Sequence, residues 1–151
     1  MTSMHGMIER AARLNPAGIA TSYEGRTTSW TNLGDRVARL AAALQSFELA
    51  EADRVAILSL NSDRYYETIF AITWAGYSVV PLNTRWALPE NNYALADSGS
   101  RILLFDDNFA QQAQQLQSEL EDVRAAIYMG DGDCPDWALS YETLIATSNP
   151  V

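Results

Sequence analysis

The run from Thr73 to Trp86 (TWAGYSVVPLNTRW) constrains the fold most, because it reads as a helix, a strand and a loop in immediate succession. The apolar residues leading to Gly76 predict a buried helix, and Gly76 can adopt the left-handed conformation that commonly ends one. Val79 and Val80 are β-branched, and Pro81 closes the strand that they predict. A short apolar strand without alternation is typical of a parallel sheet covered by helices on both faces. The run therefore predicts an α/β fold.

Helical and strand patterns continue on both sides of this run. The predicted helices are Met4 to Leu14, Thr31 to Gln45, Asp63 to Ala75, Pro89 to Ser98 and Phe109 to Leu120, and the other predicted parallel strands are Arg54 to Leu60, Arg101 to Phe105 and Val123 to Met129. Each crossover is long enough for a right-handed parallel connection. The segment from Trp137 to Thr147 predicts a short helix or strand.

A β-hairpin is predicted near the start of the chain. Ile19 to Tyr23 and Arg26 to Ser29 are short strand-like runs joined by Glu24-Gly25, which suits a tight turn. Because a hairpin is antiparallel, we expect it at a sheet edge. There is no internal repeat and no linker rich in Pro, Gly and Ser, so residues 1–151 are expected to form a single α/β subdomain.

Composition excludes several classes of partner. The formal net charge of −9 argues against nucleic acid and anionic membranes, which need a positive surface. No apolar run approaches the roughly 20 residues that span a bilayer. Cys134 is the sole cysteine and cannot form an internal disulfide, and the start MTSMHGMIER lacks a signal-peptide type of apolar segment. We therefore expect a cytoplasmic protein without a transmembrane segment.

Three segments together resemble the adenylate-forming acyl-CoA synthetases, the fatty-acid:CoA ligases. The run WAGYSVVPLNTRW is similar to the family's second core motif, usually close to K-A-G-x-V-x-V-P-L-N-x-R. Ser29 to Ala43 resembles the first core motif with its following helix, and Tyr93 to Asp107 resembles the helix, glycine turn and strand after the second motif. The resemblance follows the family's order and implies an incomplete N-terminal subdomain of its AMP-binding domain.

The resemblance implies that the parent protein adenylates a fatty or related carboxylic acid with ATP and Mg²⁺ and then transfers the acyl group to CoA. The family's Ser/Thr/Gly-rich phosphate loop, its aromatic-Gly-x-Thr-Glu segment and its C-terminal lysine are not found between Met1 and Val151. All ten basic residues are arginine, so no lysine can be placed on a phosphate oxygen. We expect this chain alone to hold no cofactor and to be inactive.

The resemblance implies two possible partners for this subdomain, and one alternative function is kept beside it. The remainder of the ligase chain, or a homo-oligomer formed through the uncovered face, would cover apolar surface that the subdomain leaves open. The alternative is a free-standing α/β interaction module derived from the same fold.

Arg85 is the first candidate site residue. It follows the strand end at Pro81, where open α/β sheets place their ligands. By resemblance, the equivalent arginine of some acyl-CoA ligases lies near the CoA nucleotide, where a guanidinium can pair with phosphate. The competing interpretation is an arginine bonded to loop carbonyls beside Trp86.

Two acidic segments are weaker candidates. Asp106-Asp107 could hold Mg²⁺, as in a phosphoreceiver domain, but such a domain also needs a lysine, so capping of the following helix is preferred. The run Gly130 to Asp133 lacks the spacing of a calcium loop and is expected to be a turn. No metal site and no catalytic residue are predicted.

The remaining candidate residues are a histidine, a cysteine and four aromatic residues. His5 and Cys134 have no partner in the sequence that would make a metal or nucleophile pair. Four aromatic residues at helical spacing could line an acyl groove, but a buried helix face explains them equally well: Tyr65, Tyr66, Phe70 and Trp74.

Overall fold

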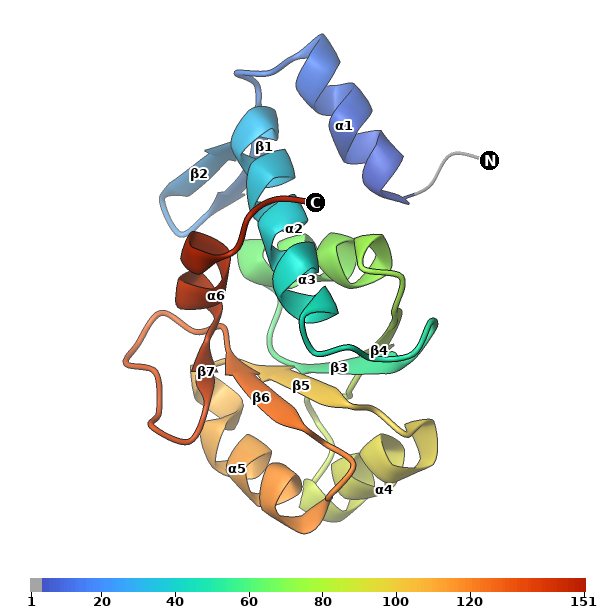
Figure 1. Ribbon diagram of the computed structural model, residues 1–151. Helices are drawn as coiled ribbons and strands as arrows, with labels where there is room; N and C mark the ends of the chain where they lie inside the picture. The colour runs from blue at the N-terminus through green and yellow to red at the C-terminus, as the bar shows by residue number, and fades with distance from the viewer. Residues whose placement is uncertain (1–3) are drawn as a thin grey trace.

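The computed structural model describes residues 4–151 (Figure 1). The helices are α1 (Met4–Leu14), α2 (Trp30–Gln45), α3 (Asp63–Trp74), α4 (Leu88–Ser98), α5 (Ala110–Glu119) and α6 (Tyr141–Thr147), with a 3₁₀ turn, η1, at Asp107–Phe109. The strands are β1 (Ile19–Tyr23), β2 (Arg26–Ser29), β3 (Arg54–Leu58), β4 (Ser78–Pro81), β5 (Ile102–Phe105), β6 (Ala125–Tyr128) and β7 (Leu139–Ser140).

The main sheet has the strand order β4-β3-β5-β6-β7, and every neighbouring pair is parallel. Val55 of β3 pairs with Val79 of β4, and Leu103 of β5 pairs with Ala56. The prediction of parallel strands in these three segments is confirmed. β4, however, lies at the edge, and its two valines are only partly buried, so the cover expected from its apolar sequence is incomplete.

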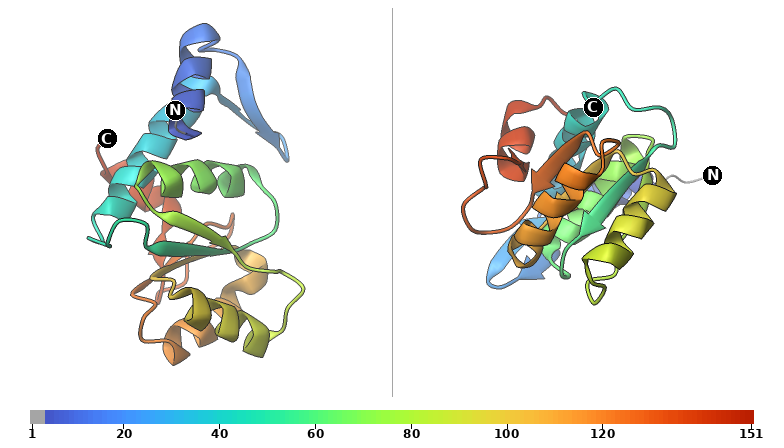
Figure 2. Two further views of the ribbon diagram at one scale, coloured as in Figure 1. Left: turned by 90° about the vertical axis from the view of Figure 1, so that its right-hand side faces the viewer. Right: turned by 90° about the horizontal axis from the view of Figure 1, so that it is seen from below.

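Helices cover both faces of the sheet, as Figures 1 and 2 show, and this also confirms the predicted fold class. The pleat sends alternate residues to opposite faces. Val55 and Ile57 of β3 join the core under α1, α2, α3 and α6, while Ala56 and Leu58 join the core over α4 and α5. The central strands are therefore apolar throughout because each residue has a covered face.

Local signals in the sequence fix where several helices begin and end. Ser29 caps α2 by accepting from the Asn32 amide, and Ser62 caps α3 by accepting from the Tyr65 amide. Gly99 ends α4 with φ of 63°, a left-handed conformation that glycine adopts without strain. These caps place the helix ends within one or two residues of their expected positions.

The expected place of the hairpin is wrong. β1 and β2 pair antiparallel, as predicted, but they form a separate two-stranded sheet rather than an edge of the main one. The hairpin lies beside α2 and the start of α3, away from β4 and β7 (Figure 1). The sequence specifies the pairing of two adjacent runs, but it does not specify which sheet they join.

The C-terminal segment contains both a strand and a helix. Leu139–Ser140 adds a short parallel strand beside β6, and α6 follows at once. Within residues 4–151, no helix is long and apolar enough to cross a membrane.

Candidate functional site

The carboxyl ends of β3, β4, β5 and β6 meet along one edge of the sheet, because all four strands are parallel. The segments that follow them are 59–62, 82–86, 106–108 and 129–131. Open α/β sheets commonly bind ligands beyond this edge. We therefore call these four segments the carboxyl edge and consider them as the candidate site.

Asp106 joins two segments of the carboxyl edge. Its Oδ2 accepts from the Leu60 amide at 2.9 Å and from Ser59 Oγ at 3.1 Å, and its Oδ1 accepts from the Asn108 amide at 2.9 Å. The last bond caps η1, so the capping role expected for Asp106 is confirmed. The same carboxylate also fixes the loop after β3.

Asp107 has a different role from the one expected. Its carboxylate accepts from the Tyr128 hydroxyl and, at 2.9 Å, from the Asp131 amide. Burial would raise the pKa of Asp107, but the hydrogen bonds from Tyr128 and the backbone outweigh it, and the pKa lies below its usual range. Asp107 therefore holds the loop after β6 rather than a helix end.

Gly130 shows how closely that loop approaches Asp107. A Cβ built at Gly130 would overlap the Asp107 carboxylate and lie 2.7 Å from the Tyr128 hydroxyl. The segment is a bend, in agreement with the turn expected for Gly130 to Asp133. In residues 4–151, no group of three or more His, Cys, Asp or Glu side chains is arranged to hold a metal ion.

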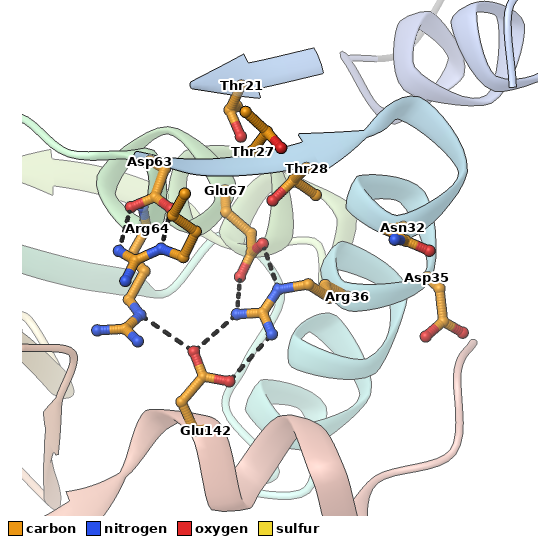
Figure 3. Close-up of a pocket in the computed structure, with 11 residues that line it drawn as sticks. Thr21, Thr27, Thr28, Asn32, Asp35, Arg36, Asp63, Arg64, Glu67 and Glu142 are labelled. Atoms are coloured by element: carbon orange, nitrogen blue, oxygen red, sulfur yellow. Dashed lines mark hydrogen bonds and ion pairs between the residues drawn. The ribbon is translucent and has the colours of Figure 1, made fainter. Parts of the chain in front are cut away.

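Next to the carboxyl edge lies a cluster of arginines and carboxylates that we call the arginine cluster: Arg26, Arg36, Arg64, Asp63, Glu67, Asp131 and Glu142. Arg36 donates to both oxygens of Glu67, at 2.8 and 3.0 Å, and also to Glu142 (Figure 3). Arg64 joins Glu142 to Asp131 and donates to the Gly130 carbonyl at 2.6 Å. Through these bonds, helices α2, α3 and α6 are tied to the carboxyl edge.

Glu67 is the most buried carboxylate of the arginine cluster, at 4% exposure. The buried Tyr141 hydroxyl donates to Glu67 Oε1 at 2.6 Å. Burial and the nearby Glu67 carboxylate raise the pKa of Tyr141, so its hydroxyl stays protonated and donating. A buried carboxylate needs such partners to offset its lost hydration.

Three pockets open along this region. One, of about 380 Å³, lies within the arginine cluster, with Thr21, Thr27 and Thr28 of the hairpin on one wall (Figure 3). A second, of about 320 Å³, is bounded by Asp106, Asp107 and the loop after β6. A third, of about 260 Å³, lies between the segments that follow β3 and β4.

Arg85 lies at the carboxyl edge but away from the arginine cluster. Its backbone amide donates to Asn83 Oδ1 at 2.9 Å, and the residue is exposed. Among residues 4–151, its guanidinium makes no ion pair or hydrogen bond, so neither the expected phosphate partner nor a loop carbonyl beside Trp86 engages it.

The four aromatic residues proposed for an acyl groove do not share one surface. Phe70 is buried in the core and Tyr65 packs against it, while Trp74 stacks on His5. Tyr66 is 40% exposed and lines an open pocket beside the hairpin. The buried helix face accounts for most of this set. Cys134 is partly buried beside the Ala138 carbonyl.

Sequence reasoning missed the arginine cluster. Its ion pairs join residues 31 to 106 positions apart, and only the fold brings them together. One signal was available: a chain whose basic residues are all arginine favours bidentate carboxylate pairing, which lysine cannot provide.

Comparison with known proteins gives consistent results for this chain. Residues 8–149 match the family described as AMP-binding enzyme. A feruloyl-CoA synthase of Amycolatopsis is 40% identical over 107 residues, which cover 71% of this chain and 22% of the relative. An indoleacetate–CoA ligase of Aromatoleum aromaticum is 34% identical over 141 residues, covering 93% of this chain and 27% of the relative.

Solved structures agree on the fold. A benzoate CoA ligase from Burkholderia xenovorans superposes with a TM-score of 0.88 at 18% identity, covering 100% of this chain and 29% of that one. A fatty acyl CoA synthetase of Mycobacterium tuberculosis superposes with a TM-score of 0.82 at 22% identity, and the match covers 99% of this chain and 29% of that one. The chain thus spans less than a third of the length of these relatives.

Proposed function

The chain belongs to the AMP-binding enzyme family, and on that premise we propose that it is the amino-terminal part of an ATP-dependent acyl-CoA ligase. In the first step the substrate carboxylate attacks the α-phosphorus of ATP and pyrophosphate leaves. In the second the CoA thiol attacks the acyl adenylate, and AMP leaves. The observation that carries the proposal is the match over residues 8–149 in a chain that spans 22% of the feruloyl-CoA synthase and 27% of the indoleacetate–CoA ligase.

The substrate that we propose is a fatty or related carboxylic acid. The relatives are named for feruloyl, indoleacetate and medium-chain fatty acyl groups, so the family accepts both aromatic and aliphatic acids. ATP, Mg²⁺ and CoA are proposed for the whole enzyme. A cytoplasmic location stays a prediction.

The isolated chain is proposed to be inactive. Charge stabilisation of the transferring adenylyl group is expected to be the largest catalytic effect, and phosphate chemistry commonly uses a lysine or a glycine-rich loop for it. The sequence has no lysine, and the cations of the arginine cluster are already paired with carboxylates. Residues of this chain would instead shape one wall of the site.

Arg85 is proposed to contact the CoA nucleotide. Its exposed guanidinium has no partner within residues 4–151, so it can pair with a phosphate without first losing another bond. In the complete ligase, Arg85→Gln should raise the KM for CoA about tenfold and leave the KM for ATP unchanged. Arg124→Gln, an exposed arginine just before β6, is the matched control. Equal effects of both variants would rule out this role.

Open surface at β4 is proposed to be covered by the remainder of the ligase or, in its absence, by a second copy of this chain. β4 is an edge strand, and Trp86 nearby is 43% exposed. Light scattering on the isolated chain should give a mass above that of one copy. A single-copy mass at every concentration would contradict pairing between copies.

Reading the gene beyond the codon for Val151 tests the central proposal. An in-frame loop of the Thr-Ser-Gly-Thr-Thr-Gly type would support the ligase fragment. A natural stop codon would support the free-standing interaction module.

A further inference from the structure

The free end of the β1–β2 hairpin is tied to the rest of the molecule by Arg26. Its Nε and Nη2 donate to the two oxygens of Asp63, at 2.7 and 2.8 Å, and its Nη1 donates to Asp131 at 2.8 Å. Asp63 begins α3, and Asp131 follows β6. One guanidinium therefore holds the hairpin to two separate elements.

The Arg26–Asp63 ion pair also divides three neighbouring pockets. Arg26 lines the pocket of about 380 Å³ and the pocket of about 320 Å³, and Asp63 lines the first of these and an open pocket of about 440 Å³ beside Tyr66. The hairpin supplies Thr21 to the first and third pockets and Tyr23 to the second and third.

The hairpin has little else to fix its free end. It is a two-stranded sheet of mostly polar residues that do not reach full burial, and an isolated two-stranded hairpin is at best marginally stable in water. Its base is anchored to α2, since β2 leads directly into this helix and the Thr31 amide and hydroxyl both donate to the Pro16 carbonyl, at 3.2 and 3.1 Å. Loss of the ion pairs would leave the free end to move about this base.

We propose that the β1–β2 hairpin is a flap latched by Arg26, and that its opening joins the three pockets into one cleft leading to the carboxyl edge. Hydrogen bonds from Arg26 outweigh burial and keep the pKa of Asp63 below its usual range, so the latch is fully charged at neutral pH. Salt is then the condition that weakens it, because screening shortens the range of charge interactions from about 10 Å at 0.1 M to about 3 Å at 1 M.

Hydrogen–deuterium exchange of the 151-residue chain tests this flap. In Arg26→Gln, amides of residues 19–29 should exchange about tenfold faster, while amides of β3 and β5 should stay within about twofold of wild type. Arg39→Gln is the matched control, since it removes the Arg39–Asp35 ion pair elsewhere on α2. It should leave residues 19–29 unchanged.

Two further measurements keep the proposal open to failure. Asp131→Asn removes one arm of the latch and should accelerate amide exchange of residues 19–29 several-fold. This variant tests the latch even if Arg26→Gln folds poorly.

Thr28→Cys places a thiol in the pocket of Figure 3. This thiol should react several-fold faster with a thiol reagent in the Arg26→Gln background, while the reaction rate of the native Cys134 thiol stays unchanged.

The proposal is overturned if Arg26→Gln leaves exchange of residues 19–29 within twofold of wild type. It is also overturned if amide exchange in β3 and β5 accelerates as much as in residues 19–29, because the change would then be global unfolding rather than flap opening. Finally, salt at about 1 M should accelerate amide exchange of residues 19–29 in the wild type but not in Arg26→Gln. Equal responses to salt would contradict a latch made of ion pairs.

Discussion

Tyr141 makes a buried hydrogen bond to Glu67, the most buried carboxylate of the arginine cluster. Tyr141 is 1% exposed, and its hydroxyl donates to Glu67 and lies 3.4 Å from the buried Thr68 hydroxyl. A hydrogen bond to a charged group contributes about 1.5–3 kcal/mol, and removing one partner leaves the other unsatisfied. This contact should therefore stabilise the whole unit.

Tyr141→Phe should lower the free energy of unfolding by about 2 kcal/mol, because Glu67 and Thr68 both lose a partner inside the core. Urea unfolding followed by circular dichroism measures this change. Tyr93→Phe removes a hydroxyl that is exposed, on a residue with 71% exposure, and should change stability by less than about 0.5 kcal/mol. Similar losses in both variants would refute the importance of the buried bond.

Two glycines should respond to alanine in opposite directions. Gly34 lies inside α2, and an added Cβ would make an ordinary contact with Ile8 at 3.6 Å, so Gly34→Ala should stabilise the chain by about 0.5–1 kcal/mol. Gly130→Ala should destabilise it by about 1–3 kcal/mol, because the Cβ would displace Asp107 and Tyr128. Thermal unfolding of both variants measures whether each change raises or lowers stability. A Gly130→Ala variant more stable than the wild type would contradict the close approach of this loop to Asp107.

At the scale of elements, α6 is held by Glu142 as well as by its apolar face. Burial would raise the pKa of Glu142, but hydrogen bonds and charge from Arg36 and Arg64 outweigh it, and the pKa lies below its usual range. A depressed folded-state pKa contributes stability that is present above the unfolded value of about 4.3. That contribution is lost as the pH falls through the folded value.

The urea midpoint of the wild type should therefore stay nearly constant from about pH 7 to 5 and fall below about pH 4. Glu142→Gln should have a lower midpoint at pH 7 and a shallower fall in acid, since one of the titrating groups is gone. Parallel curves for the two proteins would show that Glu142 does not take part in the acid sensitivity.

Much of the element order could be predicted because its signals are local. Ser29, Ser62 and Gly99 mark helix ends through bonds and dihedral angles within a few residues. The edge position of β4 could not be read in this way, since Val79 and Val80 look like residues of a covered strand. The placement of the hairpin failed for the same reason, because sheet membership is set by distant contacts.

At the candidate site, local signals identified Asp106 as a cap but not the role of its neighbour. Asp107 bonds Tyr128 and Asp131, which are 21 and 24 residues away. The arginine cluster could not be predicted from residue spacing either, because its ion pairs also join residues far apart in the sequence. Arg85 was predicted to contact the CoA nucleotide from its position after a strand and from the resemblance to acyl-CoA ligases, and this role stays a prediction.

At the scale of the whole molecule, the chain has an α/β fold with a core on each face of the main sheet, and it spans about 22–38% of the length of the proteins that it matches. Three pockets open at the carboxyl edge and in the arginine cluster beside it, and the sequence contains no lysine. This combination explains why we propose a folded unit that cannot catalyse adenylation unaided.

Exchange of labelled pyrophosphate into ATP tests that claim most directly, with a panel of aliphatic and aromatic carboxylic acids. The 151-residue chain should show no exchange above background with any acid, while the longer product of the same gene should show acid-dependent exchange. Exchange catalysed by the 151-residue chain would contradict the account, because it would mean that these residues alone bind ATP and stabilise the transferring adenylyl group.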